Sequence, residues 1–375
     1  MKHLPPACKV AIAIPVKDEA ERIGDCLRAL GWQGGGHQAQ IVLLLNNCSD
    51  ATAAVVRALQ PSLPAVVHLV ECVLPPEQAS AGHARRVAMQ HAARLLHPDG
   101  VLLTTDADSR AAPDWVSGNL AAIRRGADAV AGQAVIDPVE AALIPRRLHE
   151  DDARECAYAD LLDEVDALLD PDPADPWPRH SEHSGASIAV TLDAYRRVGG
   201  VPAAPTGEDR AFIAALRRID ARIRHAPGLQ VAVSGRIVGR AAGGMADTIR
   251  RRIVRQDPTV DDRLEPARDR ARRAALRAAF REARDRLALP PALAVALEVG
   301  IDELAAALAL PFAGAGWAML EACSPILQQN PVLRDDLARE TRQARQIRDR
   351  LRSRVSNPAA AGRAGTALPA AAAAA

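Results

Sequence analysis

The stretch Val101-Leu102-Leu103-Thr104-Thr105-Asp106-Ala107-Asp108 decides the fold, because an apolar run stops there at two carboxylates. Apolar runs of this kind are typical of strands that are buried on both faces of a parallel sheet. Such strands carry polar side chains to the rim of the sheet, where doubly wound α/β proteins bind ligands. Asp106 and Asp108 are two residues apart, so in an extended chain they lean toward one face. Two carboxylates on one face suit a hard divalent cation, which neutralises a diphosphate.

Further apolar runs alternate with helical patterns over the first 245 residues. The other expected strands are residues 10–15, 41–45, 66–73, 127–136 and 229–233, and helices are expected over 82–96, 150–169 and 208–219. This alternation predicts an α/β fold with a doubly wound, mostly parallel sheet. Residues 246–355 have a helical, Arg-rich pattern and form a C-terminal helical extension. The Ala-rich stretch 356–375 is of low complexity and is expected to be a disordered tail.

The composition argues against several classes of protein. The formal net charge of +1 provides no field that would attract nucleic acid. Only Lys2, Lys9 and Lys17 are lysines among the 47 basic residues, an arginine bias typical of a GC-rich, here presumed bacterial, genome. The six cysteines contain no C-x-x-C pair, which indicates small core residues in a reducing compartment. Because no signal peptide is recognisable, we expect a cytoplasmic protein.

Residues 304–320 form an uncharged segment that could suggest membrane contact. The segment is shorter than the roughly 20 residues that a membrane-spanning helix needs. It also contains Pro311, Gly314 and Gly316, which interrupt a continuous helix. We therefore expect a buried helical hairpin and no membrane partner.

Polar side chains gather where the predicted strands end. The clusters are Asp18 and Glu19, Asn46 and Asn47, Asp106 and Asp108, and His183, Ser184 and Gly185 in a later extended segment. Each cluster alone is weak evidence, and the two acids of a D-x-D also occur as turn or helix-cap residues. The shared position at the carboxyl ends of strands favours one ligand site that contains all four.

The order of these motifs resembles family 2 glycosyltransferases of the GT-A fold. The segments that carry the resemblance are residues 13–19 (AIPVKDE), 45–52 (LNNCSDAT), 82–86 (GHARR), 105–108 (TDAD), 184–200 (from SGAS to the Gly199-Gly200 pair) and 207–209 (GED). The resemblance covers residues 10–245 and leaves out the C-terminal helices. It implies a GT-A domain over 1–245, with a nucleotide-donor half (1–125) and an acceptor half (126–245).

The resemblance implies that the chain binds a nucleoside diphosphate sugar. The donor-binding positions are Pro15, Val16, Glu19, Asn46, Asn47, Arg85, Asp106 and Ala107. Asp108, with Asp106, would coordinate Mn²⁺ or Mg²⁺, which stabilises charge on the leaving nucleoside diphosphate. The family often has an acid at the position of Asn47, so the base of the donor stays open. Asn47 could instead form a strand-capping turn, and Arg85 could lie on a solvated helix face.

The resemblance also implies an acceptor that carries a hydroxyl group, bound near His183, Ser184 and Gly185. Asp209 is the candidate general base, because it begins a helix beside the acceptor segment. Glu208 competes for that role or supports it. With Asp209 as the base, the anomeric centre would invert.

Several alternatives remain at this point. One is a retaining transferase of the glucosyl-phosphoglycerate or mannosylglycerate type. Such enzymes often use a His after the last strand as a third metal ligand, whereas residues 234–240 contain no His. Arg236 and Arg240 in that segment could hold a diphosphate or an acidic acceptor.

Two further alternatives concern the class of protein. A nucleotidyltransferase would usually have a Gly-rich basic loop after the first strand, which residues 16–22 do not provide. A non-catalytic nucleotide-sugar-binding protein would not need Asp106, Asp108 and Asp209. The C-terminal helices could bind an acceptor, a partner protein or a second copy of the chain in a homo-oligomer.

Overall fold

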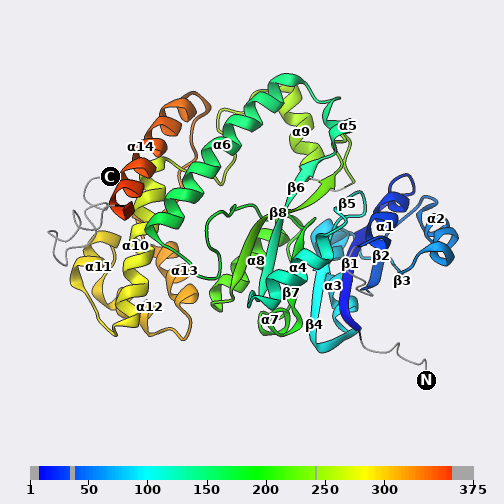
Figure 1. Ribbon diagram of the computed structural model, residues 1–375, viewed down its shortest axis with the longest axis horizontal. Coiled ribbons are helices and arrows are strands. Elements are labelled where there is room, and N and C mark those ends of the chain that lie inside the picture. Colours follow the sequence, from blue (N-terminus) through cyan, green and yellow to red (C-terminus); the bar gives the residue numbers. More distant parts are fainter. Residues whose placement is uncertain (1–7, 34–38, 241–242, 357–375) are drawn as a thin grey trace. The chain divides into compact units, whose positions relative to one another are not determined.

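The computed structural model describes residues 8–33, 39–240 and 243–356, so the Ala-rich tail beyond Ser356 lies outside the described residues. The contacts divide the chain into two compact units. The first comprises residues 1–145, 182–216 and 221–254, and the second comprises 146–181, 217–220 and 255–375. Figure 1 shows the course of the chain and the labels of its elements.

An eight-stranded sheet forms the centre of the first unit, in the order β3-β2-β1-β4-β7-β6-β8-β5 (Figure 1). The strands are β1 (Cys8–Val16), β2 (Ala39–Asn46), β3 (Val66–Cys72), β4 (Leu96–Thr104), β5 (Arg110–Ala111), β6 (Ala129–Ile136), β7 (Ile188–Thr191) and β8 (Ile223–Val233). β1, β2, β3 and β4 are parallel neighbours, and β6 is parallel to β8. β7 runs antiparallel to β4 and β6, and β5 runs antiparallel to β8. The predicted α/β class with a mostly parallel sheet is therefore confirmed.

The central strands are buried on both faces, as their apolar runs predict. Ile12 and Ile14 of β1 belong to one core cluster, whereas Ala11 and Ala13 belong to the cluster on the other face. Alternate residues of a strand point to opposite faces, so one continuous apolar run supplies both cores. The strand ends are thereby fixed, and the polar residues that follow them emerge at one rim.

Helices cover both faces of this sheet. The helices of the first unit are α1 (Ile23–Gly31), α2 (Thr52–Leu59), α3 (Ala81–Ala93), α4 (Trp115–Arg124), α5 (Pro138–Ala141), α7 (Leu192–Arg197), α8 (Glu208–Arg218) and α9 (Met245–Val254). α3 packs on β1, β2 and β4 through Ala84, Ala88 and Met89. Near its start, Gly82 lies so close to the chain that an added Cβ would come within 2.1 Å of the Ala204 carbonyl oxygen. This close approach places α3 beside the segment that leads into α8.

The second unit is helical. Its helices are α6 (Arg146–Leu169), α10 (Ala267–Asp285), α11 (Pro291–Leu297), α12 (Ile301–Ala309), α13 (Ala313–Cys323) and α14 (Leu337–Ser356). α6 packs against α10 and α14, and a core cluster joins Tyr158 and Leu162 to Val260, Leu264 and Ala344. The contacts therefore place residues 146–181 with the C-terminal helices and residues 246–254 with the sheet. The sequence analysis placed the boundary between the domains near residue 245. It assigned α6 to the first domain, because the sequence of α6 does not indicate which other helices or strands it packs against.

The uncharged segment 304–320 forms most of the contacting helices α12 and α13, as the expected hairpin requires. Leu304, Ala307 and Leu320 are buried in a core cluster together with Phe280. Within residues 8–33, 39–240 and 243–356, no helix combines the length and the apolar composition needed to cross a membrane.

The cysteines are all free thiols, as the absence of C-x-x-C pairs suggested. Cys26 is fully buried, and burial raises the pKa of its thiol well above the usual range. Cys156 and Cys323 are exposed. The expectation that all six are core residues was therefore wrong for these two.

Candidate active site

The predicted donor residues lie in the first unit, where β1, β2 and β4 end. Asp18 follows β1 in the left-handed region, with φ of 51°. Its Oδ1 accepts hydrogen bonds from the backbone N–H groups of Ser49 (2.6 Å) and Asp50 (3.2 Å). Asp50 Oδ2 in return accepts from the Ala20 N–H at 3.0 Å. The two loops are thus joined by reciprocal bonds, which hold the rim of the sheet in shape.

Asn46 and Asn47 differ in what their side chains do. The Asn47 amide donates to the Leu74 carbonyl and accepts from the Leu74 N–H, both at 3.0 Å, which fixes the loop after β3. The Asn47 side chain therefore stabilises a turn at the end of the strand, which was one of the two roles that the sequence analysis considered for it. Asn46 is buried, and its Oδ1 has no hydrogen-bond partner among the described residues.

Pro15, Val16 and Ala107 shape the site mainly through their backbone. Pro15 lies in β1 opposite Leu44 of β2, and Val16 is buried. Ala107, between the two acids, packs in the same core cluster as Trp115. The burial of this small side chain anchors the turn that carries Asp106 and Asp108.

Arg85 is the centre of a buried polar network. Its Nε donates to Glu208 Oε1 at 2.8 Å, and its NH2 group donates to Asp106 Oδ1 at 2.6 Å. Its NH1 group donates to Thr104 Oγ1 and to the Gly185 carbonyl, both at 2.9 Å. The Arg85 side chain is only 7% exposed, so α3 supplies a fixed cation and not a solvated arginine. The two carboxylates keep the pKa of Arg85 above its ordinary value despite the opposing effect of burial.

A second arginine holds the other two acids of the site. Arg236, three residues after β8, donates to both carboxylate oxygens of Glu19, at 2.6 and 2.9 Å. The same guanidinium lies 3.0 Å from Asp108 Oδ2. Burial raises the pKa of Asp108 to about 6, and the negative charges of Asp106 and Glu19 add to this effect while Arg236 opposes it. Asp108 is therefore a carboxylate whose surroundings carry more negative than positive charge.

These residues suit a divalent cation that is shared with a ligand. Among the described residues, the ion pairs of this network join four acids (Glu19, Asp106, Asp108 and Glu208) to Arg85 and Arg236, so these six side chains carry a formal charge of −2. Beside the two aspartates, the buried hydroxyls of Thr105 and Ser109 have no hydrogen-bond partner among the described residues. Within the described part of the chain, no group of three or more His, Cys, Asp or Glu could hold a metal ion alone. A divalent ion held by Asp106 and Asp108 would take further oxygen ligands, such as those of a phosphate group.

The acceptor-side residues lie next to the same network. Gly185 donates its N–H to Asp209 Oδ2 at 3.0 Å, while its carbonyl accepts from Arg85. Asp209 Oδ1 accepts from the Arg210 N–H at 2.7 Å, and Ser184 Oγ accepts from the Ala186 N–H at 3.3 Å. One glycine therefore connects the candidate base to the arginine that holds the D-x-D.

His183 lies farther along the acceptor segment and faces a histidine of β8. Its Nε2 is 3.1 Å from His225 Nε2, and the ring centroids are 5.2 Å apart. His225 is buried, whereas His183 is partly exposed. The structure therefore pairs His183, a predicted acceptor residue, with a buried histidine of β8.

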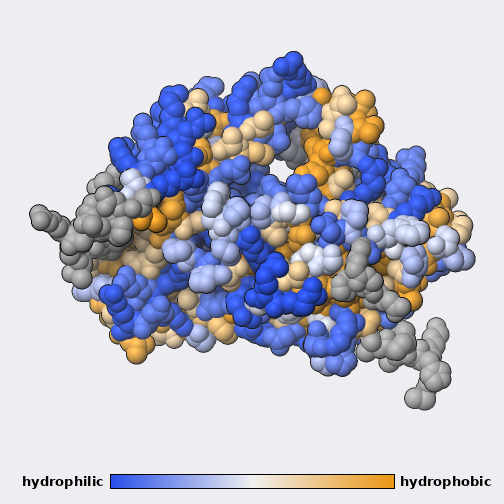
Figure 2. Space-filling view, viewed as in Figure 1, coloured by the Kyte–Doolittle hydropathy of each residue, from blue (hydrophilic) through white to orange (hydrophobic). Residues whose placement is uncertain are grey.

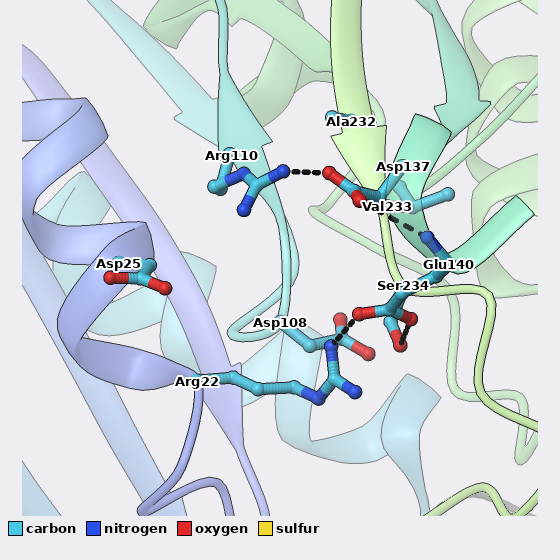
Figure 3. A pocket seen from close by; sticks show the side chains of 9 residues that line it. All are labelled: Arg22, Asp25, Asp108, Arg110, Asp137, Glu140, Ala232, Val233 and Ser234. Carbon is cyan, nitrogen blue, oxygen red and sulfur yellow. Dashed lines mark hydrogen bonds and ion pairs between the residues drawn. The ribbon is translucent and has the colours of Figure 1, made fainter. Parts of the chain in front are cut away.

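A small cavity of about 30 Å³ adjoins Asp108 (Figure 3). Arg22 pairs with Glu140 in this cavity, and Arg110 pairs with Asp137. The other Glu140 oxygen accepts from Ser234 Oγ at 2.9 Å and from the Gly235 N–H at 2.7 Å. The sequence analysis did not select Arg22 and Glu140, although the Asp137-Pro138 helix start after β6 could have indicated a rim residue.

Two apolar side chains in and just after α5 are exposed. Val139 and Leu143, next to the cavity residues of α5, are 77% and 84% exposed. Figure 2 shows apolar side chains on the surface in the region where Figure 1 places α5.

A family comparison agrees with the motif order. Residues 11–168 match the family described as glycosyl transferase family 2. Residues 11–168 therefore carry a family 2 glycosyltransferase domain, which confirms the predicted resemblance over these residues. No curated protein matches the chain.

Solved structures of glycosyltransferases are similar to the chain only at low sequence identity and with TM-scores below 0.5. A mannosyltransferase from Pyrobaculum calidifontis (PcManGT), in complex with GDP-Man and Mn²⁺, is 17% identical with a TM-score of 0.44, over 94% of this chain and 87% of that one. S. aureus TarS 1–349 in complex with UDP-GlcNAc is 15% identical with a TM-score of 0.45, over 92% of each chain. Glucosyl-3-phosphoglycerate synthase from Mycobacterium tuberculosis is 15% identical with a TM-score of 0.36, over 58% of this chain and 69% of that one.

Proposed function

We propose that the protein transfers a sugar from a nucleoside diphosphate sugar to a hydroxyl acceptor, that it needs a divalent cation, and that it inverts the anomeric centre. One observation carries the proposal. The carbonyl of Gly185 binds Arg85, which holds Asp106, while the N–H of Gly185 binds Asp209. A donor-side acid and a candidate base are thus fixed relative to each other through one glycine and one arginine.

On the donor side, Asp108 and Asp106 would hold Mn²⁺ or Mg²⁺. The bound ion would neutralise charge on the diphosphate as it leaves. The formal charge of −2 in the acid network and the unpaired hydroxyls of Thr105 and Ser109 support such a ligand. Arg85 is a positioning residue in this proposal, because its guanidinium is occupied by protein atoms.

On the acceptor side, Asp209 is the better candidate for the base. Glu208 is buried and forms an ion pair with Arg85 at 2.8 Å, so in this proposal it supports the network that holds Arg85. Asp209 is only partly buried and pairs with backbone N–H groups. Its carboxylate is held in place and retains lone pairs that can accept the proton of an attacking hydroxyl. A base on the acceptor side supports single displacement with inversion.

The test is binding and hydrolysis of a panel of nucleoside diphosphate sugars with Mn²⁺, Mg²⁺ or EDTA. We expect thermal stabilisation by one donor class only when a divalent ion is present, since a ligand that binds the folded state raises its stability. NMR of the released or transferred sugar then reports the anomeric configuration. Retention of configuration would contradict the role of Asp209. Binding that EDTA leaves unchanged would contradict the need for a metal.

A further inference from the structure

Hydrogen bonds fix the backbone of the segment that precedes Arg236. Ser234 and Gly235, which precede it, both donate to Glu140, and Glu140 also pairs with Arg22. The backbone that carries Arg236 is therefore anchored independently of the arginine side chain. A change in the contacts of the guanidinium can occur without moving β8.

The guanidinium divides its donors between two acids. It pairs with both oxygens of Glu19 and reaches Asp108 with a single group at 3.0 Å. Two-point pairing of arginine with a carboxylate is stronger and more specific than a one-point contact. The contact with Asp108 is therefore the one that can be lost while the pair with Glu19 remains.

The two arginines of the site differ in how firmly they are held. Arg85 has four protein partners and is 7% exposed. Arg236 is 20% exposed and contacts Glu19 and Asp108. Of these two cations, Arg236 is the one that an incoming ligand can displace from an acid.

We propose that Arg236 is an internal counter-cation of Asp108, which a divalent ion must displace and which then becomes available to the diphosphate. This inference rests on the proposed function, because it assigns the metal to Asp108. A guanidinium and a metal ion repel each other at one carboxylate. The metal alone should therefore bind weakly. A diphosphate that accepts the released guanidinium donor should bind together with the metal.

The test measures Mn²⁺ binding by electron paramagnetic resonance, with Mn²⁺ alone and with Mn²⁺ plus inorganic pyrophosphate. For Arg236→Gln we expect the affinity for Mn²⁺ alone to rise about tenfold, since Asp108 loses its counter-cation. The gain in Mn²⁺ affinity that pyrophosphate gives the wild type should largely disappear. Arg110→Gln is the matched control. Arg110 lines the same cavity but pairs with Asp137, so Mn²⁺ affinity should stay within about twofold.

Arg236→Lys separates charge from structure. It keeps the positive charge but cannot pair with both oxygens of Glu19. We expect its affinity for Mn²⁺ alone to stay close to the wild-type value, and a rise as large as the one expected for Arg236→Gln would overturn the inference. An unchanged or weaker Mn²⁺ affinity in folded Arg236→Gln overturns the inference while leaving the proposed function intact. If the wild type binds no Mn²⁺ even with pyrophosphate or nucleoside diphosphates, both fail.

Discussion

Arg85 Nε donates a hydrogen bond to Glu208 Oε1 at 2.8 Å, although the two residues lie 123 positions apart in the sequence. Both side chains are buried. A buried ion pair costs desolvation energy, so its value often lies in fixing geometry more than in adding stability. Here the pair connects α3 to α8, and the remaining donors of Arg85 reach Asp106 and Gly185. We infer that Arg85 and Glu208 set the distance between the donor acids and Asp209.

Gly185→Ala should disturb this network directly. A Cβ at residue 185 would lie 2.6 Å from Arg85 Cζ, closer than real contacts allow. We expect the variant to lose about 1–3 kcal/mol of stability, a range typical of overpacked sites. Transferase activity should fall more than this loss explains.

Gly228→Ala is the control for that variant. Gly228 lies in β8, and an added Cβ would meet nothing within 4 Å. Its melting temperature and activity should stay near the wild-type values. Equal melting temperatures for Gly185→Ala and Gly228→Ala would show that the close approach at Arg85 has no consequence.

Asp209→Asn should separate chemistry from donor binding. The amide can still accept the hydrogen bond from the Gly185 N–H, but it cannot take up a proton. We expect turnover to fall by about 10²–10⁴, as is usual for loss of a general base. Donor affinity, measured by calorimetry with the divalent ion present, should change less than about threefold. A parallel loss of donor binding would place Asp209 in the donor pocket.

Asp108→Ala should abolish binding of the nucleotide in its metal-dependent form. The substitution removes the carboxylate that, by proposal, holds the ion. Asp25→Ala is a suitable control, since Asp25 lines the same cavity but is exposed and pairs with Arg28. Titration of the nucleoside diphosphate with and without Mn²⁺ should show a metal effect in wild type and Asp25→Ala, and none in Asp108→Ala. A metal effect that persists in Asp108→Ala would move the ion elsewhere.

The sequence predicts best what depends on local pattern. The apolar runs locate the central strands and their ends, because burial on both faces requires uninterrupted apolar side chains. The acids Asp106 and Asp108 could be found in this way. The bidentate pair of Arg236 with Glu19 could not, since it joins residues 217 positions apart and no periodicity relates them. The roles assigned to individual site residues remain predictions.

Contacts between residues far apart in the sequence also explain why the sequence analysis could not place α6 with the C-terminal helices or Arg85 inside the protein. The helix pattern of residues 150–169 is visible, but its packing on α10 and α14 is not. Arg85 shows the same limit. An arginine on a helix is usually solvated, and only the fold shows that this one is enclosed by Glu208, Asp106 and Thr104.

The helical unit should respond to pH through Asp163 of α6. Burial raises the pKa of Asp163 to about 6, with nearby Asp166 adding to the shift and Arg270 opposing it. A carboxyl group with a raised pKa in the folded state stabilises the fold while it is protonated. That contribution is complete below the unfolded pKa of about 4 and is lost as the pH rises toward 6. Asparagine does not ionise, so Asp163→Asn does not lose this stability as the pH rises. The free energy of unfolding of the variant, relative to that of the wild type, should therefore increase by about 2 kcal/mol between pH 4 and pH 7.5.

Asp166 provides the opposite case on the same helix. Its arginine neighbours Arg270, Arg277 and Arg179 outweigh the effect of burial and lower its pKa to about 2. Its contribution is present above pH 4 and is lost as the pH falls toward 2. Asp166→Asn should therefore destabilise the unit at pH 7.5 by about 2 kcal/mol, the value of the pKa shift, because each arginine partner keeps another acid. Urea unfolding of both variants and the wild type at several pH values measures these differences. If the stability of both variants relative to the wild type changed with pH in the same direction, the two carboxylates would not be held in opposite charge environments.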